Sequence, residues 1–291
     1  MSETHPSRTR AGEFWVTLRH EIEEITGKEP MLAEYLSGLL SAQTDLRQAL
    51  AQRLARGLAN SDVPEGRITV MLMEGLHAQP DIVEATARDL IVIRSNDPAS
   101  RTYAHAFLNY KGFHAVQVSR IAHAFWRAGR IDLAAWLSNR ASFAFGPDIH
   151  PAAKLGKGIM LDHGSGIVIG ETAVVEDNVT ILQNVTLGGT GKIRGDRHPK
   201  VRKGVMIGAG ANIIGNIELG AFSKVAAGSV VIKDVPAHST VAGIPAQIVR
   251  LHNLREAVAA TKSRCSPPTQ LMTANPEISS CGPDPILTTN T

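Results

Sequence analysis

The chain has 291 residues, enough for one large domain or two modest ones, and 43% hydrophobic with 20% charged residues is typical of a globular protein. The net charge of +3 comes without a basic block, and only 4% of residues are aromatic, which argues against nucleic-acid binding. No apolar run is long enough to span a membrane and no signal peptide is recognisable, so we expect a cytoplasmic protein without membrane contact. The two cysteines, Cys265 and Cys281, form no metal or redox motif.

Residues 1–145 are predicted to form a helical domain. Apolar residues recur there at helical spacing, and Asp45 and Asp81 are candidate N-caps of two of the helices. Asn-Asp-Pro at 96–98 is expected to end the second of these helices. Gly146-Pro147 marks the predicted end of the domain.

Beyond this boundary, an aliphatic residue recurs at every sixth position. The series is Ile149, Leu155, Leu161, Ile167, Ala173, Val179 and Val185, then, after a ten-residue interruption, Val201, Ile207, Ile213, Leu219, Val225 and Val231. A period of six is the signature of a parallel β-helix, in which three hexads make one coil. We therefore predict an α+β chain, with a β-helix at 146–250 and a short helix with a disordered tail at 251–291.

The interruption at residues 191–200 reads Gly-Lys-Ile-Arg-Gly-Asp-Arg-His-Pro-Lys. A β-helix accommodates such an insertion as a loop that leaves a corner of the coil. A glycine-rich basic loop can fold over a bound anion, and loops that leave repeat folds commonly carry function.

A site must lie outside the β-helix, because aliphatic side chains fill the interior. Its flat faces favour packing against further copies of the chain, and a trimer would create three equivalent clefts. Asp148 and His163 are fifteen residues apart, a little under one coil, so neighbouring coils could bring them together. A carboxylate beside an imidazole makes an effective general base. Taken alone, Asp162-His163 and Arg197-His198 are better interpreted as surface polar groups.

The motifs extend over both halves of the chain. They include Asp148-Ile-His-Pro-Ala-Ala-Lys-Leu-Gly, Gly158-Ile-Met-Leu-Asp-His-Gly-Ser-Gly, Gly170-Glu-Thr-Ala-Val, Val185-Thr-Leu-Gly-Gly-Thr-Gly-Lys and Asp196-Arg-His-Pro-Lys in the repeats, and Asn96-Asp-Pro-Ala and Lys111-Gly-Phe-His-Ala in the helical half. Together they resemble the serine O-acetyltransferases over about residues 13–250. Other hexapeptide-repeat acyltransferases share the repeat but neither the helical half nor the Asp196-Arg-His-Pro-Lys loop.

This resemblance implies transfer of acetyl from acetyl-CoA, a co-substrate, to the hydroxyl of L-serine in cysteine biosynthesis, with no cofactor or metal. It implies a left-handed β-helix, an exception to the usual right-handed crossover. It also implies a homotrimer, commonly joined through the helical halves into a dimer of trimers. L-Cysteine has the same charged ends as serine, so inhibition by cysteine is expected.

The resemblance assigns roles residue by residue. His163 matches the general base and Asp148 the carboxylate that orients it. The residues that hold the serine amino group match Asp97 and Asp162, and those that hold its carboxylate match Arg197 and His198. The positions near acetyl-CoA match Gly189, Ala209, Lys224 and Ala227. These roles suit a zwitterion, which needs an anionic and a cationic end, and backbone N–H groups at 188–189 are candidate donors to the oxyanion.

The sequence also bears on one protein partner and on two alternative functions. Family members end in an isoleucine that binds O-acetylserine sulfhydrylase, whereas this sequence ends in Thr291, which argues against that partner binding through the terminus. An acyltransferase with another acceptor and a zinc lyase resembling the gamma carbonic anhydrases are the alternatives, to be separated by an acceptor panel and by metal analysis. The histidines His105, His114 and His123 are expected to be packing or surface groups on helices.

Overall fold

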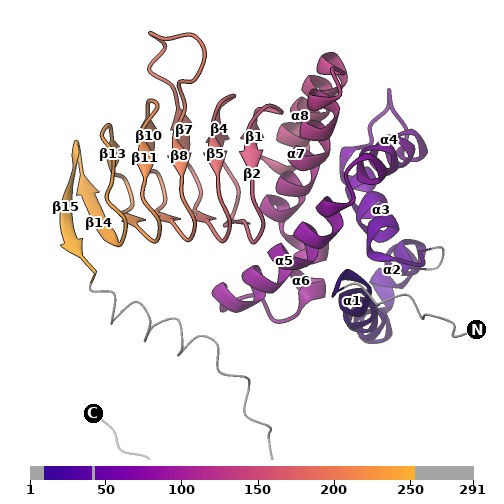
Figure 1. Cartoon of the computed structure of the whole chain (residues 1–291). Coiled ribbons are helices and arrows are strands. Elements are labelled where there is room, and N and C mark those ends of the chain that lie inside the picture. Colours follow the sequence, from indigo (N-terminus) through magenta and orange to yellow (C-terminus); the bar gives the residue numbers. More distant parts are fainter. Residues whose placement is uncertain (1–9, 41–42, 253–291) are drawn as a thin grey trace, which may run out of the picture. The chain divides into compact units, whose positions relative to one another are not determined.

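The structure, a computed structural model, describes residues 10–40 and 43–252 as a helical half followed by a β-helix (Figure 1). The helices are α1 Arg10–Lys28, η1 Pro30–Leu32, α2 Ala33–Leu40, α3 Leu46–Leu58, α4 Glu65–Ala78, α5 Asp81–Asn96, α6 Tyr103–Asn109, α7 Lys111–Arg127 and α8 Ile131–Phe145. None of the helices in the described ranges is long and apolar enough to cross a membrane.

Two helix starts test the capping predictions. Asp45 caps α3, because its side chain accepts a hydrogen bond of 2.9 Å from the backbone N–H of Gln48. The prediction that Asp81 caps the later helix is wrong, because the N-cap is Pro80 and Asp81 is the first residue of α5. Pro80 already has helical dihedral angles, φ −59° and ψ −28°, so the helical turn begins before Asp81. The end of α5 at Asn96 agrees with the predicted break.

The β-helix begins directly after α8. Its strands are β1 Asp148–Ile149, β2 Lys154–Leu155, β3 Met160–Leu161, β4 Val168–Ile169, β5 Val174–Val175, β6 Thr180–Ile181, β7 Thr186–Gly188, β8 Lys200–Val201, β9 Met206–Ile207, β10 Asn212–Ile214, β11 Glu218–Leu219, β12 Lys224–Val225, β13 Val230–Val231, β14 Ser239–Gly243 and β15 Ala246–Leu251. They form sheet A (β1-β4-β7-β10-β13), sheet B (β11-β8-β5-β2) and sheet C (β15-β14-β12-β9-β6-β3).

Each strand from β1 to β10 pairs in parallel with the strand three places further along, so three hexads make one coil, as predicted. The last strand, β15, instead pairs antiparallel with β14. The short helix predicted from residue 251 is therefore wrong at its first residue, because Leu251 ends β15. The rest of that helix and the predicted disordered tail lie outside the described residues. The left hand of the coil stays a prediction.

The stacking differs in phase from the predicted series. Ile149 pairs with Ile169, and Leu161 pairs with Ile181, so the first coil spans twenty residues. From Ile169 to Leu187 the coil has the regular eighteen. Two extra residues therefore lie between β3 and β4, in the Asp-His-Gly-Ser-Gly segment at 162–166.

The predicted corner residues between the two insertions are nevertheless buried. Ile167, Ala173, Val179 and Val185 are all enclosed, because the residue two places before each strand residue also faces the interior. A single interruption of ten residues is thus wrong, because two of the extra residues follow β3 and eight lie between β7 and β8. The period of six was predicted correctly. The predicted series, however, joins two different rows of buried residues, one made of strand residues and the other of the residues two places before them.

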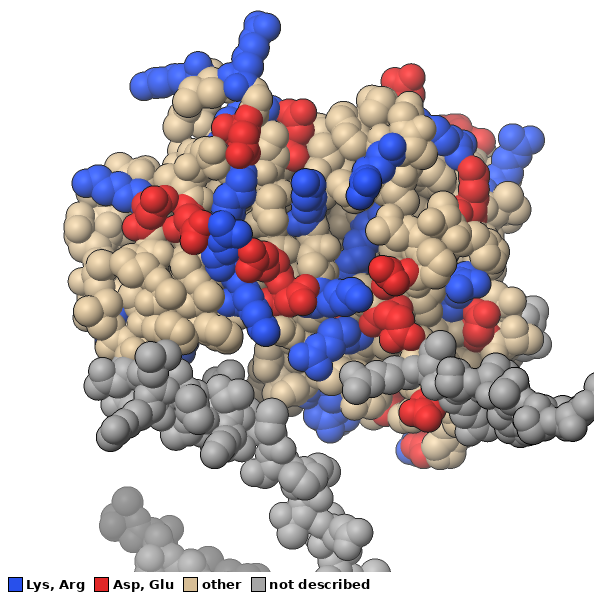
Figure 2. Space-filling view, viewed as in Figure 1, with Lys and Arg blue, Asp and Glu red and all other residues tan. Residues whose placement is uncertain are grey.

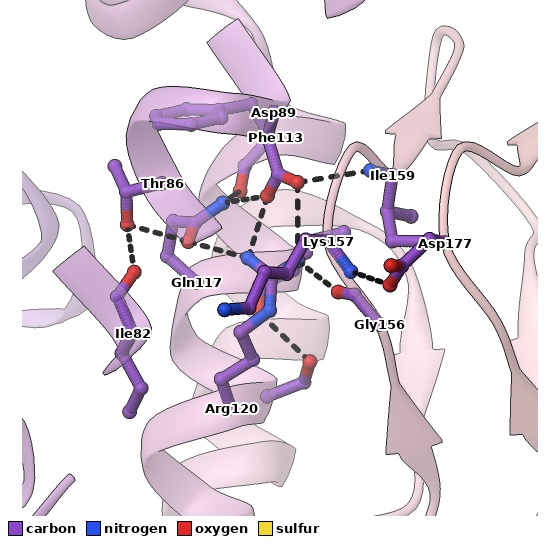
Figure 3. A network of polar contacts seen from close by, with 12 residues as sticks. Ile82, Thr86, Asp89, Phe113, Gln117, Arg120, Gly156, Lys157, Ile159 and Asp177 are labelled. Atoms are coloured by element: carbon purple, nitrogen blue, oxygen red, sulfur yellow. Dashed lines mark hydrogen bonds and ion pairs between the residues drawn. The ribbon is translucent and has the colours of Figure 1, made fainter. Parts of the chain in front are cut away.

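A buried polar network joins the helical half to the first coil (Figure 3). Asp89 on α5 forms an ion pair of 2.5 Å with Arg120 on α7 and accepts a hydrogen bond of 2.8 Å from Gln117. The second Arg120 nitrogen donates to the carbonyl oxygen of Gly156, and the backbone N–H of Ile159 donates to Asp89, at 2.6 and 2.9 Å. The side chains therefore fix the β-helix to the helices by hydrogen bonds to its backbone.

Candidate active site

An acidic cluster lies where the helical half meets the end of β3. Asp97, just beyond α5, accepts a hydrogen bond of 2.6 Å from the hydroxyl of Tyr110, the residue that precedes α7. Burial and this hydrogen bond raise the pKa of Tyr110 to about 12, and the nearby charge of Asp162 adds to the effect. We call Asp97, Tyr110 and Asp162 the acidic cluster. Both predicted aspartates therefore act on the ionisation of Tyr110, a residue that sequence reasoning missed.

His163 lies beside this cluster in the turn created by the two extra residues. Its φ of 57° places it in the left-handed region, and its side chain is 71% exposed. Its Nε2 is 3.8 Å from the Asp162 carboxylate. A group that is exposed and next to a carboxylate can exchange protons with a bound molecule.

The start of α7 supports this turn. Gly112 allows a close approach, because a Cβ atom built there would lie 2.1 Å from the carbonyl oxygen of Leu161. Lys111 donates a hydrogen bond of 2.6 Å to the hydroxyl of Ser165. The helical half therefore positions both sides of the turn that carries His163.

Asp148 is exposed on sheet A, where β1 pairs with β4. The sequence spacing predicts that Asp148 lies against His163. In the structure, His163 instead follows β3, which belongs to sheet C. No hydrogen bond or ion pair joins the two side chains within the part of the single chain that is described. The expected proximity rested on an eighteen-residue coil, whereas the first coil has twenty residues.

The eight-residue insertion places Arg197 and His198 against the corner that follows β4. Arg197 donates a hydrogen bond of 2.5 Å to Glu171, which lowers the pKa of that carboxyl group. The Thr172 hydroxyl accepts hydrogen bonds from the backbone N–H groups of both loop residues, at 2.9 and 3.0 Å. His198 is 7% exposed and its ring lies on Gly170. We call Arg197 and His198 the basic pair.

Burial, followed by the charge of Arg197, lowers the pKa of His198. Burial also lowers the pKa of the neighbouring His150, whose ring contacts Trp126. Both imidazoles therefore favour the neutral form, so the positive charge of the basic pair resides on Arg197. Sequence reasoning missed Glu171, Thr172 and His150, although all three lie within matched segments.

The positions expected near acetyl-CoA fall into two groups. Gly189 lies beside Arg197, since a Cβ atom at Gly189 would be 3.3 Å from the arginine side chain. Ala209 and Ala227 lie at equivalent corners of neighbouring coils, where the carbonyl oxygen of Ala209 accepts a hydrogen bond from Gly228. Lys224 is exposed on β12 of sheet C. Among the described residues of the single chain, no hydrogen bond or ion pair joins the two groups.

The described residues contain no group of three or more His, Cys, Asp or Glu side chains that could hold a metal ion.

Comparison with known proteins gives a consistent result. The family model "Serine acetyltransferase, N-terminal" matches residues 14–118. The serine acetyltransferase of Salmonella typhimurium is 51% identical over 235 residues, which cover 81% of this chain and 86% of the relative. A chloroplastic serine acetyltransferase of Arabidopsis thaliana is 47% identical over 237 residues, covering 81% and 76%.

Solved structures of serine acetyltransferases share the fold. The Brucella abortus protein in complex with coenzyme A has a TM-score of 0.81 at 47% identity, covering 83% of this chain and 96% of that one. A complex with cysteine has a TM-score of 0.81 at 48% identity, covering 83% and 94%. The soybean protein complexed with serine has a TM-score of 0.81 at 44% identity, covering 84% and 100%. The chain therefore belongs to the serine acetyltransferase family.

Proposed function

We propose that this protein transfers the acetyl group of acetyl-CoA to the hydroxyl of L-serine, giving O-acetyl-L-serine and CoA. The observation that carries the proposal is the pairing of an acidic cluster beside His163 with a separate basic pair. Serine is a zwitterion with a hydroxyl between its charged ends, so it needs a carboxylate site, an ammonium site and a base. Relatives in complex with coenzyme A, with serine and with cysteine support this choice of ligands.

The complete site is proposed to form between neighbouring copies in a trimer. Within one chain Asp162 and His163 follow β3 of sheet C, whereas the basic pair packs against the corner after β4 of sheet A. The β-helix of a second copy that packs along these faces can place its basic pair opposite the acidic cluster of the first copy. Asp148, on β1 of sheet A, would then orient His163 of the neighbouring copy.

The distribution of charge supports packing through sheet A. After Asp148, the outward positions of that sheet are uncharged, namely Val168, Thr186, Asn212 and Val230. Sheet B instead carries a ladder of ion pairs in which Arg202 contacts both Glu176 and Glu218. Figure 2 shows opposite charges interleaved over the coils. Charged positions suit a solvent-facing sheet, and uncharged ones suit an interface.

The proposed reaction is direct transfer. His163 takes the proton from the serine hydroxyl while the oxygen attacks the thioester carbonyl carbon. The backbone N–H groups at 188–189 stabilise the oxyanion of the tetrahedral intermediate. When the carbon–sulfur bond breaks, the CoA sulfur takes the proton from the His163 imidazolium. Asp97 and Asp162 hold the ammonium group.

Five further assignments belong to the same proposal. Acetyl-CoA lies along the cleft beside Gly189, Ala209, Lys224 and Ala227. L-Cysteine competes at the serine site, because it has the same charged ends. Residues 1–145 act as the oligomerisation domain that joins two trimers, residues 146–250 as the acyltransferase domain, and the protein works in the cytoplasm.

The test is the rate at which the thioester absorbance of acetyl-CoA is lost, a signal that the thiol of added cysteine does not obscure. We expect loss that depends on L-serine, is absent with L-alanine, which lacks the hydroxyl, and is suppressed by L-cysteine in competition with serine. Loss that is unaffected by serine, with turnover of another acceptor from a panel of amino acids and sugars, would overturn the proposed acceptor. Serine-dependent loss without competition would overturn the shared site for cysteine.

A further inference from the structure

The hydroxyl and the backbone N–H of Thr172 are directed at the basic pair, whereas its carbonyl oxygen accepts a hydrogen bond from Lys200. Its hydroxyl oxygen lies 2.9 Å from the backbone nitrogen of Arg197 and 3.0 Å from that of His198. The same oxygen is 2.9 Å from Nδ1 of the His198 ring, and the Thr172 backbone nitrogen is 3.2 Å from that Nδ1. One residue at the corner after β4 therefore makes four contacts with two consecutive loop residues.

The direction of each hydrogen bond follows from the chemistry of its partners. Backbone N–H groups can only donate, so the two loop nitrogens occupy both lone pairs of the Thr172 hydroxyl. The hydroxyl proton can then be donated to Nδ1 of His198, and the Asp196 carboxylate is a second acceptor within its reach. The Thr172 N–H also donates to Nδ1, which must therefore be unprotonated. The neutral ring consequently carries its proton on Nε2.

Nε2 is free to act on a ligand. Among the described residues, no group forms a hydrogen bond with Nε2. The atom is nevertheless not fully enclosed by the protein. The ring edge that carries Nε2 lies over Gly170, where a Cβ atom would come within 2.1 Å of Nε2. Protonation of Nδ1 would place a donor against the Thr172 N–H and a hydroxyl whose lone pairs are filled. This arrangement agrees with the lowered pKa of His198.

We propose that Thr172 is a positioning residue that holds His198 as the Nε2–H tautomer, so that this N–H is donated to the carboxylate of the amino-acid substrate. The proposal rests on the proposed function. Glu171 fixes the Arg197 guanidinium in the same corner, so consecutive residues orient the two halves of the basic pair. Thr172 itself need not touch the substrate.

The test compares Thr172→Val, which keeps the shape but removes the hydroxyl, with Thr172→Ser, which keeps the hydroxyl. The acceptors are L-serine and L-serinamide, which retains the hydroxyl and amino groups but has no carboxylate. We expect Thr172→Val to raise the KM for serine by roughly tenfold to a hundredfold, the range for a hydrogen bond to a charged group. The KM for acetyl-CoA and the kcat/KM for serinamide are expected to stay within about twofold of the wild-type values. A twofold change is small beside the tenfold that corresponds to about 1.4 kcal/mol.

Controls separate positioning from folding. Thr172→Ser should restore the serine KM, and Thr69→Val, which removes a half-buried hydroxyl on α4, should leave every constant unchanged. In a His198→Asn background, whose amide donor has no tautomers, adding Thr172→Val should have no further effect on the ratio of serine to serinamide turnover. If Thr172→Val does not assemble, Thr172→Ala serves as the hydroxyl-free variant in the same comparison.

Two results would overturn the proposal. An unchanged serine KM in a folded hydroxyl-free variant would show that the hydroxyl does not orient His198. Equal losses with serine and serinamide would show a general structural role. A wild-type enzyme that does not acetylate serine would instead contradict the proposed function, so the two failures can be distinguished.

Discussion

At the scale of single residues, His163 combines the properties that a general base requires. It is exposed, lies 3.8 Å from the Asp162 carboxylate and occupies a turn outside the packed interior. We expect His163→Ala to lower kcat roughly 10²–10⁴-fold, because proton transfer from the serine hydroxyl then has no positioned acceptor. Steady-state kinetics measure this loss.

The same substitution should leave the fold unchanged, because the His163 side chain is mostly exposed. Thermal unfolding and sedimentation of His163→Ala are therefore expected to match the wild type. Near-normal turnover in a correctly assembled variant would remove His163 as the base.

Residues that act through a motif could be predicted from the sequence, whereas those that act through another side chain could not. Asp97, Asp162 and the basic pair were identified by type and position. Tyr110 and Thr172 were missed, because their partners are thirteen and about twenty-six positions away in the sequence. The Thr172 contacts also depend on where the insertion between β7 and β8 is placed. A threonine beside a glutamate carries no signal of its own in a single sequence.

At the scale of elements, the β-helix could be predicted in kind but not in phase. The hexads between the two insertions bury both a strand residue and the residue two places before it, as with Ile169 and Ile167. A two-residue insertion therefore moves the series from one interior column to the other without any loss of hydrophobicity. The insertion after β3 was hidden for this reason, although it creates the turn that carries His163.

The start of α7 makes a prediction about how this turn is held. Gly112→Ala would place a methyl group 2.1 Å from the Leu161 carbonyl oxygen, a backbone atom that cannot move without the turn. We expect a loss of about 1–3 kcal/mol in the free energy of unfolding, as for overpacked sites, together with a reduced kcat. Chemical denaturation and kinetics measure the two effects.

Gly66→Ala is the matched control, because a Cβ atom at Gly66 on α4 meets nothing within 4 Å. That change should stabilise the helix by up to about 1 kcal/mol and leave kcat unchanged. A Gly112→Ala variant that behaves like the control would show that the close approach does not position the turn.

At the scale of the whole molecule, the described residues, 10–40 and 43–252, belong to one compact unit. The sequence suggested a boundary at 145/146, and the chain does change there from helices to strands. However, the Asp89–Arg120 pair and its hydrogen bonds to Gly156 and Ile159 cross this boundary. Removing one partner of a buried ion pair is strongly destabilising, so the two halves are expected to unfold together. No sequence pattern linked α5 to the first coil.

His114 on α7 relates this shared stability to pH. It is 1% exposed, its Nε2 is 2.8 Å from the Phe107 carbonyl oxygen, and its ring contacts Phe113 and Phe145. Burial lowers its pKa from 6.5 to about 3. Between these values the unfolded chain binds a proton that the folded chain does not. The contribution of His114 to stability is therefore complete above pH 6.5 and declines as the pH falls towards 3.

We expect this single group to remove about 2 kcal/mol from the free energy of unfolding between pH 7 and pH 5. His150 and His198 also have lowered pKa values, so the decisive quantity is the difference between wild type and His114→Gln, whose amide can still donate to Phe107. Urea unfolding at both pH values should show a smaller acid loss in His114→Gln. His20→Gln, on the exposed face of α1, should retain the wild-type loss. Equal acid losses in wild type and His114→Gln would mean that the folded state accepts a proton at His114, and that its surroundings open without global unfolding.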